Sequence, residues 1–182
     1  MCIRDRFLSG VSEPVEGTCV TVTLEGRRPL VAEVQSLLTP SAGGSPRRTV
    51  SGVDAARVNM LLAVLQRRAR FALAQDDCYV ATVGGVRLSE PASDLAVAVA
   101  VASAKLSAPV PQGMIAVGEL GLAGEVRPVP GIGRRVREAA RLGFTRALVP
   151  RSPEPLGEVP AGFTVAEVGS IGEALATIPT WT

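Results

Sequence analysis

Few residues of this chain could carry out catalysis. It has 182 residues and no histidine, which excludes Ser-His-Asp and Cys-His catalytic sites as well as histidine-based metal sites. The three cysteines, Cys2, Cys19 and Cys78, are scattered without C-x-x-C spacing, so we expect reduced thiols and neither a zinc site nor a disulfide framework. A serine nucleophile would need a neutral lysine as its base, and Lys105 is the only lysine.

The one place with a suggestive arrangement of polar residues is the start of a predicted helix. Residues 95–104 are apolar on all sides, which predicts a buried central helix. Ser89 is the expected N-cap, and Pro91 and Asp94 fall in the first turn, as helix starts prefer. Any chemistry in this chain should therefore lie at this helix start or at the Pro/Gly-rich loop 128–133.

Three polar side chains at this helix start need an interpretation. Lys105 lies about 13 residues along the helix from Ala92, roughly 20 Å at 1.5 Å per residue, which is too far for its amine to reach Ser93. Glu90 and Asp94 form either a carboxylate pair for acid-base or metal chemistry, or ordinary partners of the helix dipole. Acids in a first helical turn are typical of the second case.

Periodicity predicts the elements that must position these residues. Alternation and short apolar runs predict strands at 18–24, 30–38, 47–50, 77–83, 114–117, 125–127, 146–149 and 163–168, with the first two forming a hairpin. A 3.6-residue period predicts helices at 53–70, 132–142 and 171–178. Gly84-Gly85 indicates a bulge or a close backbone approach, and 118–124 a turn that joins two strands. This order predicts a single α/β or α+β domain, with a core of Val, Ala and Leu because aromatics make up only 3%.

The basic residues are almost all arginines, whose planar guanidinium suits phosphate or carboxylate. Four groups stand out: Arg27 and Arg28 in the hairpin turn, Arg47 and Arg48 after the Gly/Ser/Pro loop 39–46, Arg134, Arg137 and Arg141 on one outer helix face, and Arg67, Arg68 and Arg70 at a helix end. The last group complements the helix dipole. For every other group a solvated or subunit-bridging arginine is the alternative, and a GC-biased genome would give the same composition.

Several classes of protein are not indicated. The net charge of +2 implies no partner by itself, and no apolar run approaches the roughly 20 residues that span a bilayer. No signal-peptide pattern and no P-loop motif occur, so we expect a cytoplasmic protein that does not bind nucleoside triphosphate in that way. Residues 1–6 (MCIRDR) fit nothing that follows, and we treat them as an unmatched N-terminal remnant. The remaining residues, 7–182, are predicted to form a single domain.

Residues 118–129 (GELGLAGEVRPV), followed by a helix that ends in AARLG, resemble the Lon-type protease domain. Within that superfamily the chain is most similar to the C-terminal Lon-like domain of the RadA (Sms) family of bacterial DNA repair proteins. The phrases that carry this similarity are EGRRPL (25–30), PRR (46–48), VGGV (83–86), EP (90–91), DLA (94–96), GE (118–119) and RPVP (127–130). The resemblance implies a ribosomal-protein-S5-domain-2-like fold and a ring that acts on DNA. It also implies that the family's zinc finger and RecA-like ATPase core lie outside this chain.

The same resemblance implies that the peptidase dyad is absent. The family's G-P-S-A-G turn falls on residues 90–94, so the nucleophile position is Ala92, and the lysine position falls on Gly133. Ser93 stands one residue later, and one helical position rotates a side chain by about 100°. We therefore expect no enzymatic activity from this chain. An active Ser-Lys peptidase is the least favoured alternative, because both positions of the dyad lack the required residue.

We therefore expect a non-proteolytic Lon-like domain of a DNA repair and recombination ATPase. Its expected role is that of a hexamer scaffold that contacts single-stranded or branched DNA during branch migration. The candidate phosphate contacts are Arg27, Arg28, Arg47, Arg48, Arg134, Arg137 and Arg141, with Arg47 and Arg48 favoured because they match the family phrase beside a Gly-rich loop. The alternative is an oligomerisation module without DNA contact. No cofactor, metal or membrane partner is expected.

Overall fold

The computed structural model describes residues 14–152 and 155–178, which form a mixed α/β domain. The predicted remnant at residues 1–6 lies outside the described residues. The strands are β1 (Thr18–Glu25), β2 (Arg28–Pro40), β3 (Arg48–Ser51), β4 (Asp76–Thr82), β5 (Met114–Ala116), β6 (Glu119–Leu120), β7 (Val126–Arg127), β8 (Arg146–Pro150) and β9 (Thr164–Val168). The helices are α2 (Ala55–Arg68), α3 (Asp94–Leu106), α4 (Ile132–Arg141) and α5 (Ile171–Ala176), with two 3₁₀ turns, η1 (Val83–Gly85) and η2 (Pro91–Ser93).

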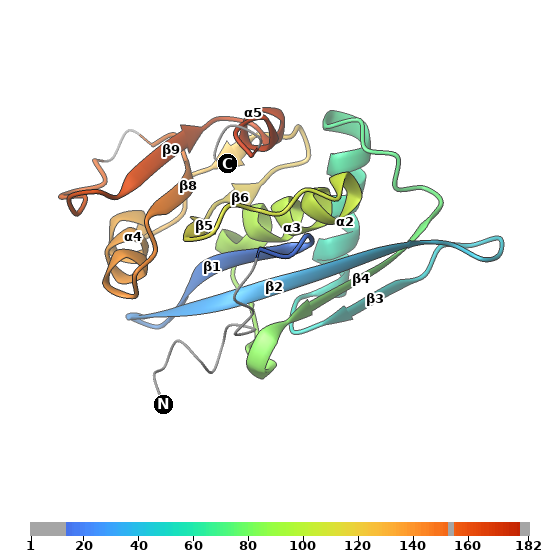
Figure 1. The fold of residues 1–182 in the computed structure, drawn as a ribbon, viewed down its shortest axis with the longest axis horizontal. Helices are drawn as coiled ribbons and strands as arrows, with labels where there is room; N and C mark the ends of the chain where they lie inside the picture. Colours follow the sequence, from blue (N-terminus) through green and yellow to red (C-terminus); the bar gives the residue numbers. More distant parts are fainter. Residues whose placement is uncertain (1–13, 153–154, 179–182) are drawn as a thin grey trace.

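A seven-stranded sheet runs through the molecule in the order β3-β4-β2-β1-β5-β8-β9 (Figure 1). The pairs β1–β2 and β2–β4 are antiparallel, whereas β3–β4, β1–β5, β5–β8 and β8–β9 are parallel. The predicted hairpin is thus confirmed. The mixed sheet also confirms the predicted α/β class, because a helix lies in the connection of the parallel pairs β3–β4, β1–β5 and β5–β8.

Helices cover both faces of this sheet. On one face α2, α3 and α5 share a large apolar cluster with β1, β2 and β4, and on the other face α4 packs with Val22, Val31 and neighbouring strand residues. Every residue of α3 from Asp94 to Ser103 is buried, which confirms the predicted central helix. Its alternating Ala and Val side chains let the neighbouring layers approach closely.

Helix α2 lies within the predicted range 53–70 but begins two residues later, at Ala55, and it carries a narrower apolar face. Asp54 caps its N-terminus by accepting a hydrogen bond from the Arg57 backbone N–H at 2.7 Å. Its buried residues are Val58, Leu61, Leu62, Val64 and Leu65. Within the described ranges, no helix combines the length and the apolar character needed to cross a bilayer.

Three local predictions were wrong. Ser89 is exposed and does not cap α3, because Pro91 starts the 3₁₀ turn η2 and the α-helix begins only at Asp94. Gly84 and Gly85 form the turn η1 instead of a bulge: both adopt positive φ there, and a Cβ at Gly85 would meet nothing within 4 Å.

The third correction concerns the turn expected at residues 118–124. Strand β5 does not form a hairpin with the following strand; it pairs in parallel with β1 and β8 in the main sheet. The segment after it contains β6, which pairs with β7 in a separate two-stranded ribbon. The physical reason is the length of the segment, which has room for a second short strand before the turn.

Candidate functional site

The position expected for a serine nucleophile, Ala92, is sealed in the core. It is 2% exposed, lies in η2 and belongs to the same apolar cluster as Ile132 of α4. Its carbonyl oxygen accepts a hydrogen bond from the Gly118 N–H at 2.8 Å, and the Gly118 carbonyl in turn accepts from the Leu95 N–H at 3.1 Å. The segment after β5 thus closes over the start of the central helix.

The position expected for the catalytic lysine, Gly133, is closed by a different segment. Gly133 lies in the first turn of α4, and a Cβ added there would stand 2.2 Å from the backbone carbonyl oxygen of Leu156. Real Cβ atoms do not approach an oxygen that closely, so this position accepts no side chain while Leu156 stays in place. The loop before β9 therefore covers the space that a lysine would need.

The remaining candidates for a nucleophile and a base are already engaged. Ser93 is 3% exposed and its hydroxyl donates to the Glu90 carbonyl oxygen at 3.0 Å. The Lys105 amine donates to Asp76 Oδ2 at 2.6 Å, at the far end of α3. Burial raises the pKa of the Cys19 thiol to about 12, so this thiol stays protonated and unreactive.

Glu90 at this helix start is the partner of a buried arginine that the sequence analysis missed. Arg135 of α4 is fully buried, and its guanidinium donates to Glu90 Oε2 at 2.8 Å and to the Val22 carbonyl oxygen at 2.6 Å. Glu90 Oε1 also accepts from the Leu24 N–H at 2.8 Å. This pair joins α4, β1 and the start of α3 at the place where the resemblance puts an active site.

A second ion pair holds Asp94 on the other side of the helix start. Arg57 of α2 binds it with two donors, Nε to Oδ1 at 2.6 Å and Nη2 to Oδ2 at 2.5 Å, and the Leu120 N–H donates to Oδ2 at 3.1 Å. Burial nevertheless raises the pKa of Asp94, outweighing the hydrogen bonds from Arg57 and Leu120. Glu90 and Asp94 thus bind different arginines. They form neither a carboxylate pair for acid-base or metal chemistry nor mere partners of the helix dipole, because each is a member of its own ion pair.

The Glu90 carboxylate should give this domain a specific pH dependence. Burial alone would raise its pKa, but hydrogen bonds from Arg135, the Leu24 N–H and Thr23 lower it below the ordinary 4.5. Its contribution to stability is therefore present above that value and is lost as pH falls through the folded-state pKa. We expect the stability difference between wild type and Glu90→Gln, measured by urea unfolding, to be largest at neutral pH and to shrink in acid. A difference that grows on acidification would contradict this assignment.

The fold brings two of the predicted arginine groups together. Arg134 of α4 donates from Nη1 to the Arg27 carbonyl oxygen at 3.3 Å, so α4 lies beside the β1–β2 turn although the two are 107 residues apart. Arg27, Arg28, Arg134 and Arg137 are exposed, and no carboxylate of the described residues lies within ion-pair distance of them. We call these four residues the α4 surface.

The α4 surface borders an open groove of about 720 Å³ between the loop that precedes α4 and the loop that precedes β9. Arg134 and Arg137 line it together with Gly133 and Leu156. The groove thus runs past the closed lysine position, and the charged side chains among its described lining residues are cationic. Such a groove can take a phosphate group or another anion.

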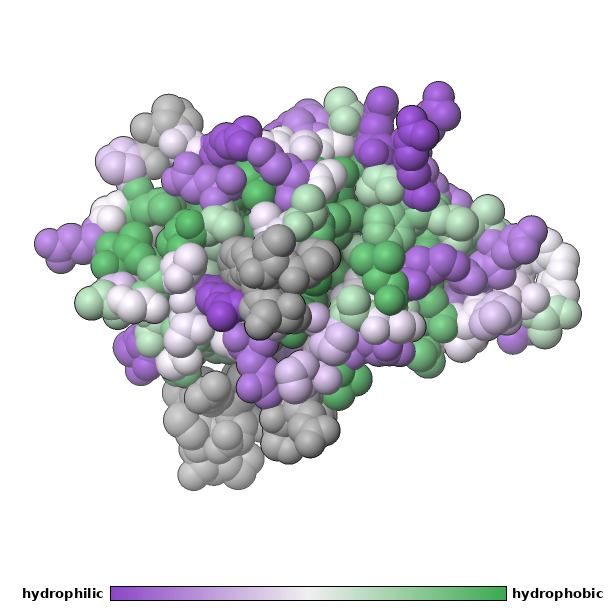
Figure 2. Space-filling view, turned by 45° about the horizontal axis from the view of Figure 1, so that its top comes forward, coloured by the Kyte–Doolittle hydropathy of each residue, from purple (hydrophilic) through white to green (hydrophobic). Residues whose placement is uncertain are grey.

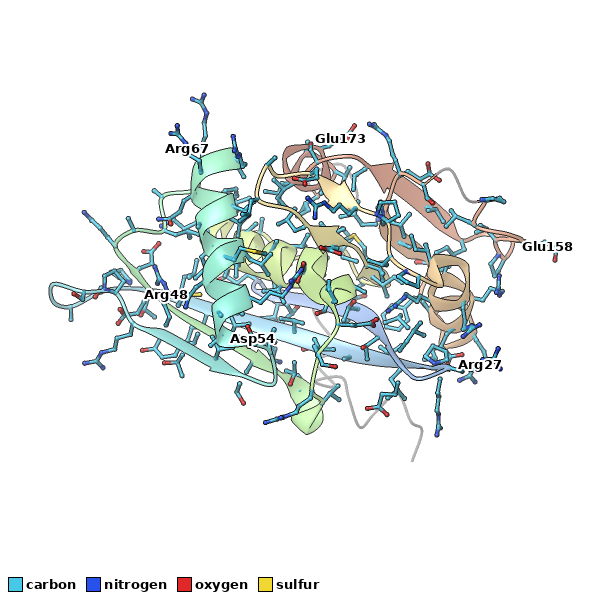
Figure 3. All side chains as sticks on the ribbon, turned by 180° about the vertical axis from the view of Figure 1, so that it is seen from behind. Arg27, Arg48, Asp54, Arg67, Glu158 and Glu173 are labelled. Carbon is cyan, nitrogen blue, oxygen red and sulfur yellow. The ribbon has the colours of Figure 1, made fainter. Side chains whose placement is uncertain are left out.

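The other predicted arginines are placed differently. Arg141 binds Glu138 with two donors at 2.9 and 2.7 Å. Arg48, which the family phrase favoured, donates to the backbone carbonyl oxygens of Leu73, at 3.1 Å, and Asp76, so it holds β3 against the start of β4. Arg47 is exposed, and Figure 3 shows Arg48 far from Arg27. The 47–48 pair therefore lies apart from the α4 surface.

The fold and this site define a Lon-like domain. Residues 63–153, half of the chain, match the family model described as subunit ChlI of Mg-chelatase, so the chain belongs to the ChlI-like (Lon-like) domain family. More particularly, it is homologous to the bacterial DNA repair protein RadA, as the sequence phrases predicted.

Three relatives illustrate this homology. DNA repair protein RadA of Mycobacterium tuberculosis is 53% identical over 169 residues, which cover 93% of this chain and 35% of that protein. The Mycolicibacterium smegmatis protein is 49% identical over 180 residues, 97% of this chain and 38% of the relative, and that of Streptococcus pyogenes is 43% identical over 172 residues, 94% and 38%. The chain therefore spans a little over a third of the length of these relatives.

Proposed function

We propose that this chain is a non-catalytic Lon-like domain that acts as a scaffold and contacts DNA within a repair and recombination ATPase. In this proposal the domain has the ribosomal-protein-S5-domain-2-like topology, holds no cofactor and works in the bacterial cytoplasm. It contributes to a hexameric ring that migrates branched DNA. Homology to DNA repair protein RadA supports the repair context, and the closed positions at Ala92 and Gly133 support the absence of peptidase activity.

The observation that carries DNA contact is the α4 surface. Its arginines come from two segments far apart in sequence, and the fold gathers them with no carboxylate of the described residues within ion-pair distance, although Arg28 is near enough to help lower the pKa of Glu138. Guanidinium groups gathered on one surface can neutralise successive phosphates, and this electrostatic attraction needs no recognition of the bases. Arg47 is a secondary candidate, whereas Arg48 and Arg141 have few donors left for phosphate.

Fluorescence anisotropy of a labelled single-stranded oligonucleotide, titrated with this chain from low to near-physiological salt, tests the proposal. We expect binding that weakens steeply with salt. The double variant Arg134→Ala/Arg137→Ala should lower affinity about tenfold at low salt and reduce the salt slope by about 1 for each phosphate contact removed. Arg48→Ala/Arg141→Ala, which removes the same charge, is the matched control and should bind within about threefold of wild type.

Two results would overturn direct DNA contact through this surface. One is an absence of binding at low salt by folded protein, which would leave the oligomerisation module as the function. The other is an equal loss in the Arg134/Arg137 and Arg48/Arg141 variants, which would mean that net charge rather than this surface sets the affinity.

A further inference from the structure

A second cationic surface lies at the C-terminal end of α2, apart from the α4 surface, and is not used by the proposed DNA contact. Arg67, Arg68 and Arg70 are exposed at the C-terminal end of α2, and hydrophilic side chains project from the molecule over this end in Figure 2. Among the described residues none of the three has a carboxylate within ion-pair distance. The helix dipole accounts for a cation in the last turn, but Arg70 lies beyond it.

An exposed leucine is held next to these arginines. Leu122, at the turn between β6 and β7, is 66% exposed, the highest fraction among the large apolar side chains of the described residues. Arg68 Nε donates to its carbonyl oxygen at 3.2 Å. We call Leu122 and the three arginines the Leu122 surface.

The turn that presents Leu122 is rigid. The Gly121 N–H donates to the Glu125 carbonyl oxygen and the Gly124 N–H to that of Gly121, each at 2.9 Å. The Gly124 carbonyl accepts from the Ile171 N–H at 2.8 Å, and a Cβ at Gly124 would meet the Arg68 stem at 3.0 Å. Because the turn is fixed from both sides, ordering Leu122 in a contact would cost little conformational entropy.

A preorganised apolar side chain among unpaired arginines is typical of a protein interface rather than of a nucleic-acid contact. Apolar and arginine side chains dominate the energetic centres of protein interfaces, whereas phosphate contacts need no exposed leucine. The Leu122 surface is complementary to a partner surface that has an apolar strip with free carboxylates at its border.

The chain itself carries a surface of that kind along β9. This strand is an edge of the sheet, and Val165 and Glu167 alternate onto the face that packs toward α4. Phe163 and Val165 are only partly buried there, and Glu167 and the nearby Glu158 are exposed without an ion pair among the described residues. We call Glu158, Phe163, Val165 and Glu167 the β9 surface.

The Leu122 surface and the β9 surface lie well apart on the molecule: in Figure 3 Arg67 stands at the top, at the end of α2, whereas Glu158 stands at one end of the long axis. Two complementary patches that lie this far apart cannot meet within one molecule, but they can meet between copies that are arranged head to tail. Such heterologous contacts close into a ring when the rotation between copies permits it.

We propose that the Leu122 surface of one copy of this chain docks on the β9 surface of the next copy. This inference rests on the scaffold part of the proposed function and identifies the two surfaces that make the contact. Leu122 packs against Phe163 and Val165, and the arginines bind Glu158 and Glu167.

Sedimentation equilibrium of the purified chain tests the contact by charge exchange. We expect wild type to self-associate, and Arg67→Glu/Arg70→Glu and Glu158→Arg/Glu167→Arg each to weaken association about tenfold or more through like-charge contacts. The combined fourfold variant should recover association to within about threefold of wild type, because the charges are opposite again. Leu122→Ser should weaken it without any change in charge.

Arg27→Glu/Arg28→Glu is the matched control, because it makes the same charge change at exposed residues outside both surfaces. It should leave association within about threefold of wild type, and circular dichroism checks that every variant is folded. Wild type that stays monomeric at its solubility limit, or a fourfold variant that does not recover, would overturn the proposal.

Oligonucleotide anisotropy on the same variants separates this inference from the proposed DNA contact. The Arg67/Arg70 variant should bind DNA with nearly wild-type affinity at protein concentrations where the chain is monomeric. If that variant loses DNA affinity while its sedimentation is unchanged, the Leu122 surface is a nucleic-acid contact and the docking proposal is wrong. If DNA binding fails in wild type but the charge exchange succeeds, the interface stands without the DNA contact.

Discussion

Replacing Arg135 with alanine should destabilise the folded domain by about 3–5 kcal/mol. The substitution leaves the Glu90 carboxylate partly buried without its partner and leaves the Val22 carbonyl oxygen without its 2.6 Å hydrogen bond. Removing one member of a buried ion pair costs far more than the pair contributes, because the remaining charge stays desolvated. Urea unfolding followed by circular dichroism measures the loss.

Two variants make this prediction specific to the ion pair. Arg134→Ala removes the neighbouring, exposed arginine of the same helix and should change stability by about 0.5 kcal/mol or less. Arg135→Met/Glu90→Gln removes both charges and should be more stable than Arg135→Ala, because no unpaired carboxylate remains. A loss in Arg134→Ala as large as that in Arg135→Ala would show that charge on α4, not the Glu90 pair, stabilises the fold.

The sequence carried a signal for Arg135 that its arginine-rich surroundings hid. Arg135 lies three residues after Ile132 and four before Ala139, both of which face inward, so helical period alone places it on the buried face. Its neighbours Arg134 and Arg137 were correctly assigned to the outer face. An arginine at an inward position needs a carboxylate partner, and Glu90 was available in the resemblance motif.

Local pattern was enough for the central helix and the hairpin, because both are determined by residues close in sequence. Ala and Val fill every position of α3 from 96 to 102, and a helix buried on all sides accommodates that pattern. By contrast, Arg27 and Arg134 meet across 107 residues, and Leu156 covers Gly133 from a separate loop. No periodicity encodes such contacts, so the α4 surface and the closure of the lysine position emerge only from the fold.

Rebuilding the dyad with Ala92→Ser/Gly133→Lys should not create a peptidase. A serine hydroxyl at position 92 would enter an apolar cluster at 2% exposure, and a lysine at 133 would collide with the Leu156 carbonyl oxygen. We expect casein hydrolysis indistinguishable from that of wild type, together with a loss of stability of about 1–3 kcal/mol for each substitution. Hydrolysis above wild type that needs both substitutions would contradict the closed geometry.

The single substitution Gly133→Ala tests whether Leu156 closes this position, because the closure determines whether the substitution raises or lowers the stability of the domain. In an open helical position, alanine in place of glycine stabilises a helix by about 0.8–1 kcal/mol. Here its Cβ would stand 2.2 Å from a backbone oxygen, which cannot yield as a flexible side chain would, so the same substitution should destabilise the domain. Gly172→Ala in α5 is the matched control, because its Cβ would meet only the Ser170 hydroxyl at 4.0 Å, and it should be neutral or stabilising. Stabilisation by Gly133→Ala would mean that the loop at Leu156 moves aside, and the groove beside α4 would then be open to a side chain.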